Sequence, residues 1–366
     1  MLNDFEFEQN SLTLNWHDGR VTRLDVLWLQ DHDPAGRHAN GQRLISVLDL
    51  DWQATIQSVE RQDDELVIRL SNDRRLHYSL ARLHQDGLVS QQDDRGWSGK
   101  TLWRGEDFQV PTVDWQAYQS QDDARRRALA AVADSGLVLL RGVPCEPGQV
   151  LKVIETFGFV RETNYGRLFD VQTVVSPSNL AFSNLGLGPH TDNPYRDPVP
   201  GIQLLHCLAN EVDGGENLLV DGFQAAAMLR QEYPEAFELL TQVRLPYRFS
   251  DGQADLRSRV PFIETDQAGN VLKVRYNNRS IAPFMLPFDE QRAFYQAYRL
   301  WAEVLSDPEL ALTFRLEPGD CLVFDNTRVM HARTAFTDGG RRHLQGAYSD
   351  LDGLYSSLYQ SGAQSC

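Results

Sequence analysis

Residues 188–208, GPHTDNPYRDPVPGIQLLHCL, place a polar segment directly before a run of apolar residues. Glycine and proline crowd the first half of this stretch, which is typical of a loop. The run 201–208 has the length and composition of a buried strand. His190 and Asp192 are two residues apart, and alternate residues of an extended chain point to the same side. The stretch therefore predicts a strand and, beside it, a loop that presents an imidazole and a carboxylate together.

Short strands of this kind dominate the chain beyond residue 100. The strand candidates are GLVLLRGV (136–143), GIQLLHCL (201–208), ENLLVDGF (216–223), NVLKVRYNN (270–278), LTFRLEPGDCLVFDN (312–326) and RHLQGAYSD (342–350). Helices are predicted outside these strands, over 124–135, 146–158, 224–243 and 289–307. A parallel sheet would need a helix between most strands, and those helices are missing. The pattern predicts a mainly β fold with flanking helices, a double-stranded β-helix or jelly roll.

A small N-terminal β-rich domain is predicted over 1–92, and the larger domain over 93–366. SLTLNWHDGRVTRLDVLWL (11–29) alternates apolar and polar residues around a turn, which predicts a hairpin. ELVIRLSNDRRLHYSL (65–80) repeats this pattern, with Asn72 and Asp73 at the turn. The stretch 91–115 is polar, contains glycine and shows no clear periodicity, so we interpret it as the linker.

Composition excludes several classes of partner. The 366 residues carry a formal net charge of −16, which argues against binding nucleic acid or an anionic membrane surface. The four cysteines are widely spaced and form no CxxC pair, so we expect a reduced, cytoplasmic protein. Neither a signal peptide nor an apolar run of membrane-spanning length is evident. A small molecule is the expected partner.

A metal site is the sharpest chemical prediction. His331 follows a strand-like segment, 319–326, and is the best candidate to join His190 and Asp192. Two histidines and one carboxylate, with open positions opposite, are typical of non-haem Fe(II) oxygenases. Arg342 follows in the next strand candidate, where its guanidinium could hold a carboxylate in a bidentate pair. Arg341 competes for that role, but the alternation of a strand lets only one of the two face inward.

Motifs in a fixed order carry a family resemblance. The chain contains NYGRLFDV (164–171), NLAFSN (179–184), HTDNPYRDPVPGIQLLHCL (190–208), GGENLLVDGF (214–223), VRYNNRSIAPF (274–284), LEPGDCLVFDNTRVMHAR (316–333) and RHLQGAYSD (342–350). This order resembles the γ-butyrobetaine dioxygenases, which are Fe(II)/2-oxoglutarate-dependent oxygenases related to taurine dioxygenase. The likeness covers nearly the whole chain and includes the small N-terminal domain.

The resemblance implies a cofactor set and a role for each matching residue. His190, Asp192 and His331 match the iron ligands, and Arg342 matches the residue that binds the distal carboxylate of 2-oxoglutarate. The implied reagents are Fe(II), 2-oxoglutarate and O2, with ascorbate as an optional addition. A homodimer is also implied.

An aromatic cage for a trimethylammonium group is the second implied site. The matching positions are Tyr165, Phe169, Phe182 and Tyr348. Ring faces attract a quaternary cation that can neither donate nor accept a hydrogen bond. Without the resemblance, ordinary core packing would be the favoured explanation for these aromatic residues.

Two departures from the family change the expectations. The family's N-terminal zinc site uses three cysteines and a histidine, but Asp33, Ala35 and His38 stand in place of the cysteines, with His77 as the matching histidine. Alanine cannot ligate, so we expect no structural zinc.

The second departure lies at the positions that would bind the anionic end of the substrate: Asn193, Tyr195, Asn278 and Arg279. Their donors suit a phosphonate. At these positions the chain resembles bacterial relatives that hydroxylate 2-trimethylaminoethylphosphonate and also lack the zinc cysteines, so the resemblance implies this compound as the preferred substrate class. The alternative is a γ-butyrobetaine dioxygenase that makes L-carnitine. Arg279 could instead belong to a surface ion pair.

Two other classes of protein compete with the oxygenase. A cupin-like isomerase or a zinc hydrolase could use the same two histidines and carboxylate, but would not need Arg342. A betaine-binding protein would keep the aromatic cage and would need no metal ligands. Of these three classes, only the oxygenase would use both the metal ligands with Arg342 and the aromatic cage.

Overall fold

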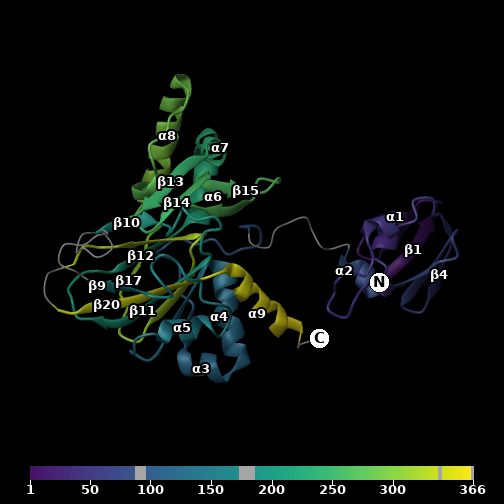
Figure 1. Cartoon of the computed structure of the whole chain (residues 1–366), viewed down its shortest axis with the longest axis horizontal. Coiled ribbons are helices and arrows are strands. Elements are labelled where there is room, and N and C mark those ends of the chain that lie inside the picture. Colours follow the sequence, from purple (N-terminus) through teal and green to yellow (C-terminus); the bar gives the residue numbers. More distant parts are fainter. Residues whose placement is uncertain (87–95, 173–185, 337–339, 364–366) are drawn as a thin grey trace. The chain divides into compact units, whose positions relative to one another are not determined.

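The computed structural model describes residues 1–86, 96–172, 186–336 and 340–363 (Figure 1). The chain divides into two compact units, Met1–Gln92 and Asp93–Cys366. Strands dominate both, and the predicted mainly β class with flanking helices is confirmed. Within the described ranges, no helix combines the length and the apolar character needed to cross a membrane.

The first unit contains two three-stranded antiparallel sheets. Their strands are β1 (Leu2–Phe7), β2 (Ser11–Trp16), β3 (Val21–Asp25), β4 (Ile56–Gln62), β5 (Glu65–Leu70) and β6 (Arg75–Ser79), and the unit's helices are α1 (Val26–Asp31) and α2 (Leu80–Asp86). Leucines from β2 and from β5 are buried in one shared core, so the two sheets pack together. The alternation seen in the sequence therefore reflects one buried face on each sheet.

The second unit is built on a four-stranded and a six-stranded sheet. The first has the order β10 (Leu187–His190), β19 (Val329–Arg333), β12 (Asn217–Asp221), β17 (Leu312–Phe314). The second has the order β7 (Thr112–Asp114), β8 (Leu137–Arg141), β18 (Cys321–Asp325), β11 (Ile202–Asn210), β20 (Arg342–Ser349), β9 (Phe169–Gln172). Leu219 and Val329 of the smaller sheet share a core with Leu205 and Leu322 of the larger one. The two sheets therefore face each other, as the jelly-roll prediction requires.

Helices cover the outer face of the larger sheet (Figure 1). They are α3 (Trp115–Ser120), α4 (Asp122–Ser135), α5 (Gln149–Ile154) and α9 (Leu351–Ala363). Val138 and Leu140 of β8 point into this helix layer, whereas Leu137 and Leu139 point between the sheets. A central strand that is buried on both faces has consecutive apolar residues. The sequence 136–143 has this pattern, which is why it predicts a strand.

A separate lobe holds α6 (Gly222–Glu232), α7 (Pro234–Gln242), α8 (Phe288–Leu305) and the hairpins β13 (Leu245–Ser250) with β14 (Asp255–Val260), and β15 (Ile263–Thr265) with β16 (Val271–Val274). Its core contains Phe262, Phe294 and Trp301, all buried. The lobe stands on the opposite side of the sheets from α4 and α5 (Figure 1).

Four predicted elements need correction. The helix over 224–243 is broken into α6 and α7, because Pro234 disfavours a helical backbone at Tyr233, which adopts φ −137 and ψ 65. The helix over 146–158 is shorter, since α5 ends at Ile154. The strand over 312–326 is two strands, β17 and β18, which lie in different sheets.

The fourth correction concerns the hairpin over 11–29. Its second strand ends at Asp25, whose side chain accepts a hydrogen bond from the backbone N–H of Leu27 and so caps α1. The sequence VLWL therefore continues as a helix instead of a strand.

Much of the predicted linker, 91–115, belongs to the larger unit. Trp103 is buried between the sheets, and its indole N–H donates to the carbonyl of Ser135 at 2.7 Å. Trp97 packs against the core of the lobe, and β7 pairs in parallel with β8. Tryptophan side chains bury large apolar areas, so the two tryptophans could have predicted that this stretch packs against the larger unit. The polar residues around them led to its interpretation as a linker.

His206, on β11, makes the fold sensitive to acid. Burial lowers the pKa of this imidazole, an effect that the Val143 backbone partly offsets, so the histidine is neutral in the folded protein. The unfolded chain takes up a proton near pH 6.5. Below that pH the unfolded state binds more protons, so the free energy of unfolding should fall by about 1.4 kcal/mol per pH unit for this one group. In the metal-free protein, the lowered pKa values of His190 and His331 also make the free energy of unfolding fall as the pH falls.

Urea unfolding of the metal-free protein at a series of pH values measures this slope. His206→Gln should make it shallower, whereas His17→Gln, at an exposed position, should leave it unchanged. An identical slope in His206→Gln and the parent protein would contradict the assignment.

Candidate active site

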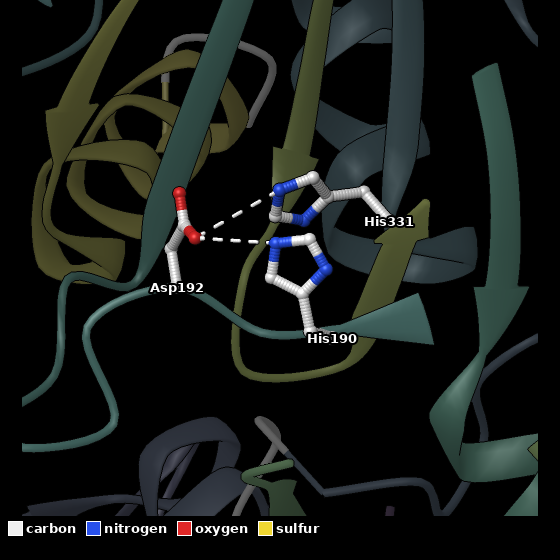
Figure 2. Close-up of side chains that lie close together, drawn as sticks. All are labelled: His190, Asp192 and His331. Carbon is white, nitrogen blue, oxygen red and sulfur yellow. Dashed lines mark ion pairs between the residues drawn. The ribbon is translucent and has the colours of Figure 1, made fainter. Parts of the chain in front are cut away.

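Two histidines from neighbouring strands and one aspartate converge between the sheets (Figure 2). His190 ends β10 and lies directly opposite His331 in the β10–β19 pairing, with ring centroids 4.2 Å apart. Asp192 follows two residues later. Its Oδ1 lies 3.6 Å from Nε2 of His190 and 3.9 Å from Nε2 of His331. One ligand atom from each residue lies within 4.8 Å of the others.

Both histidines are in the protonation state that a metal needs. Nδ1 of His190 lies 2.9 Å from the carbonyl of Gly188, to which it donates, so Nε2 presents its lone pair toward Asp192. Burial and the neighbouring His331 lower the pKa of His190 to about 3. Burial also lowers the pKa of His331, although Asp192 opposes this shift. At neutral pH both rings are neutral and able to coordinate.

Asp192 is held at both its backbone and its side chain. The Asn326 side chain accepts from the backbone N–H of Asp192 at 2.8 Å and donates to its carbonyl at 3.0 Å. Oδ2 accepts from Gln203 at 2.8 Å and from the Tyr348 hydroxyl at 2.7 Å. Burial alone would raise the pKa of this carboxyl, but the two histidines and these donors hold it below its ordinary value. The aspartate is therefore ionised.

The donor set fits a divalent iron ion. Two neutral imidazoles and one carboxylate, without a fourth ligand from the described residues, match the arrangement of non-haem Fe(II) sites. Among the described residues, this is the only cluster of three or more histidine, cysteine or acidic side chains arranged to hold a metal.

Arg342, at the start of β20, is buried, whereas Arg341 is exposed. Within the described residues no carboxylate lies at ion-pair distance from Arg342; its Nη2 donates to the carbonyl of Gly215 at 3.4 Å, and its Nε has no partner there. Burial lowers the pKa of its guanidinium. A buried cation without a carboxylate partner is suited to bind an anion.

Arg333 is a neighbour of Arg342 that the sequence analysis did not single out. It lies two residues after His331 on β19, and both guanidinium groups lie over the ring of Phe336, at 4.8 Å for Arg333 and 5.3 Å for Arg342. Burial and the charge of Arg342 lower the pKa of Arg333 to about 10. The strand alternation that starts at His331 could have indicated it, because residues 331 and 333 share one face.

Three of the four predicted cage residues form an aromatic cluster. Phe169 stacks on Tyr348 with centroids 5.2 Å apart, and Tyr165 lies 6.2 Å from Phe169. Gly346 leaves room for the Phe169 ring, which a side chain at that position would strike. Phe182, the fourth, lies outside the described residues.

The cluster extends further than the sequence suggested. Tyr195 and Tyr165 join through their hydroxyls at 3.1 Å. Phe249, on β13 of the lobe, stacks on Tyr195 with centroids 5.1 Å apart and lies 5.8 Å from Tyr165. Phe249 comes from a hairpin remote in sequence from every motif, so nothing in its neighbourhood pointed to the site.

The residues predicted for the anionic end of the substrate separate into two groups. Asn193 and Tyr195 are buried, and Asn193 adopts a left-handed backbone with φ 54. Both polar atoms of the Asn193 amide are buried without a hydrogen-bond partner in the described part of the chain. Asn278 and Arg279 lie instead on an exposed 3-10 turn, η4 (Asn278–Ser280).

The residue before this turn is the one that faces inward. Asn277, and not Asn278, is buried, and its side chain donates to the carbonyl of Thr191 at 3.3 Å. Arg279 is near enough for its charge to help lower the pKa values of His190 and His331, after burial. It therefore lies on the solvent side of the three-residue cluster.

At the position of the family's zinc site, each candidate ligand has another partner. Asp33 is buried, accepts from the backbone N–H of Ala35 at 3.1 Å and lies 3.4 Å from Arg74. His38 accepts from the backbone of Asn40 at 3.3 Å. His77 is exposed, 3.8 Å from Glu65.

Comparison with known proteins gives consistent matches over the whole chain. The model of the family "Taurine catabolism dioxygenase TauD, TfdA family" matches residues 100–348. The γ-butyrobetaine dioxygenase of Pseudomonas sp. (strain AK-1) is 35% identical, over 95% of this chain and 93% of its own. Human γ-butyrobetaine dioxygenase is 33% identical, over 94% of this chain and 92% of its own. The trimethyllysine dioxygenase of Meyerozyma guilliermondii is 28% identical, over 96% of this chain and 94% of its own. The predicted enzyme class, a 2-oxoglutarate-dependent dioxygenase, is confirmed: the chain belongs to the TauD, TfdA family of dioxygenases.

Proposed function

We propose that this dioxygenase hydroxylates a methylene group of a small trimethylammonium zwitterion. The relatives named above include γ-butyrobetaine and trimethyllysine dioxygenases, which supports a quaternary ammonium substrate. The single observation that carries the proposal is Tyr348. Its ring stacks on Phe169 in the aromatic cluster, while its hydroxyl donates to Asp192 at 2.7 Å. A cation held by these rings would lie beside the three candidate metal ligands.

In this proposal His190, Asp192 and His331 hold Fe(II), and Arg342 binds the distal carboxylate of 2-oxoglutarate. With O2, iron and 2-oxoglutarate supply the oxidising power for C–H hydroxylation. The protein's own contribution is orientation. The aromatic cluster fixes the cationic end of the substrate and polar side chains fix the anionic end, so that one methylene faces the metal.

The anionic end decides between two substrate classes. Asn193 offers a buried amide without a partner among the described residues, and Arg279 adds a guanidinium on the solvent side. A guanidinium suits a phosphonate, which supports 2-trimethylaminoethylphosphonate as the preferred class. The second candidate is γ-butyrobetaine, which the two γ-butyrobetaine dioxygenases among the relatives favour.

A substrate panel tests this proposal. The holoenzyme with Fe(II), 2-oxoglutarate and air is given 2-trimethylaminoethylphosphonate, γ-butyrobetaine, and the isostere of each in which carbon replaces the quaternary nitrogen. Mass spectrometry follows the gain of one oxygen. We expect the phosphonate to react fastest and each carbon isostere to react far more slowly than its trimethylammonium parent, because the rings attract the positive charge that the isostere lacks. Turnover of γ-butyrobetaine alone would overturn the phosphonate preference, and no product from any cation would overturn the function.

Arg342→Gln should raise the KM for 2-oxoglutarate by about 10-fold or more, because a hydrogen bond to a charged group contributes about 1.5–3 kcal/mol. Succinate formation at varied 2-oxoglutarate concentration measures this. Arg341→Gln is the matched control, since Arg341 is the adjacent guanidinium and is exposed. An equal rise in KM for both variants, or none for Arg342→Gln, would contradict the role given to Arg342.

We keep the homodimer and the cytoplasmic location as predictions. The first rests on the resemblance, and the second on widely spaced cysteines without a CxxC pair. Sedimentation of the purified protein and cell fractionation test them.

A further inference from the structure

The two carboxylate oxygens of Asp192 have different neighbours. Oδ1 faces Nε2 of both His190 and His331, at 3.6 and 3.9 Å (Figure 2). Oδ2 accepts a hydrogen bond from Nε2 of Gln203 at 2.8 Å and another from the hydroxyl of Tyr348 at 2.7 Å. With two donors on Oδ2, only Oδ1 is directed at the position a metal would take.

These two donors come from one rigid part of the fold. Gln203 on β11 and Tyr348 on β20 lie directly opposite each other in the antiparallel ladder, and both are buried. The two histidines are likewise a directly opposed pair, but on the four-stranded sheet. Asp192 therefore meets a histidine pair from one sheet with one oxygen, and a donor pair from the other sheet with its second oxygen.

We infer that Gln203 and Tyr348 are positioning residues that make Asp192 a one-oxygen ligand. The inference rests on the proposed iron site. A carboxylate free to bind through both oxygens would occupy one more coordination position. Holding Oδ2 by hydrogen bonds keeps that position open for the co-substrate and oxygen, which this class of site requires.

Tyr348 allows the positioning role to be separated from the aromatic one. Tyr348→Phe keeps the ring that stacks on Phe169 and removes only the donor to Asp192. The matched control is Tyr165→Phe in the same cluster, because the Tyr165 hydroxyl contacts the Tyr195 hydroxyl at 3.1 Å and, among the residues the structure describes, bonds to no carboxylate. Gln203→Leu removes the second donor independently.

The test loads the metal-free protein with Mn(II) and measures water-proton relaxation, which reports metal-bound water. In Tyr348→Phe and Gln203→Leu, the freed Oδ2 should displace one water, lowering the relaxivity by about a third if three positions of an octahedral ion are open. Tyr165→Phe should give the same relaxivity as the parent protein. In turnover, Tyr348→Phe should lower kcat while the KM for the trimethylammonium substrate changes little, because the ring remains.

Parent relaxivity in both Tyr348→Phe and Gln203→Leu would overturn the inference. Should Tyr348→Phe fail to fold, Gln203→Leu alone decides it in the same way. Failure of the proposed function has a different signature: Mn(II) would then bind the parent protein and His190→Ala equally well.

Discussion

Replacing His190 with alanine should reduce 2-oxoglutarate-dependent succinate formation to the background rate of iron in buffer. The ring contributes one of three ligand atoms, and the other two come from Asp192 and His331. Loss of a residue that merely supports a metal ligand costs about 10–100-fold in affinity or activity, so loss of a ligand should cost more. Succinate release in the presence of a turned-over substrate measures the effect.

Two comparisons make this result specific to the metal site. Asp192→Asn keeps the size of the side chain but removes the charge, and its succinate formation should also fall to the background rate. His17→Ala removes an exposed histidine from the other compact unit and should retain the parent rate. The site assignment fails if His190→Ala turns over as fast as the parent protein.

Arg328→Met should destabilise the larger unit by about 3–5 kcal/mol, because it leaves a buried carboxylate without its cation. Arg328 is 2% exposed, and its Nε and Nη2 donate to Asp221 at 2.9 and 2.8 Å. It also donates to the carbonyl of Thr101 at 2.6 Å. The guanidinium therefore joins the segment before β7 to Asp221, the residue that caps the N-terminus of α6. The free energy of unfolding in urea measures the loss.

A matched surface pair separates burial from charge pairing. Arg299 and Glu303 are exposed on α8 and lie 2.7 Å apart, and Arg299→Ala should cost only about 0.3–0.5 kcal/mol. The double variant Arg328→Met with Asp221→Leu should recover part of the single loss, because no uncompensated charge then stays buried. Equal costs for Arg328→Met and Arg299→Ala would contradict this account.

Much of the fold could be predicted because its patterns are local. Residues 137–140 are all apolar since this part of β8 is buried on both faces, and Gly136 ends α4 in a left-handed conformation with φ 88. The division of 312–326 into strands of two different sheets was not predictable in this way. A turn at Pro318 and Gly319 indicates where the chain bends, but not which sheet each half joins.

The candidate site shows the same limit. His190 and His331 are 141 positions apart, so no local pattern could show that they pair, although His331 was a candidate because it follows a strand-like segment. The structure makes them directly opposed residues of paired strands. The resemblance implied Asn278, whereas the structure buries the preceding residue, Asn277. A turn has no regular alternation that would show which of two adjacent side chains faces inward. Gln203 and Phe249 reach the site only through contacts between segments that are distant in sequence. No local sequence pattern could have predicted those contacts.

The most direct test of the central claim is anaerobic absorption spectroscopy with Fe(II) and 2-oxoglutarate. If His190, Asp192 and His331 hold iron and Arg342 holds the co-substrate, the parent protein should develop a visible charge-transfer band when both are added. Asp192→Ala should not develop it. The absence of the band from the parent protein, with both reagents in excess, would contradict the account.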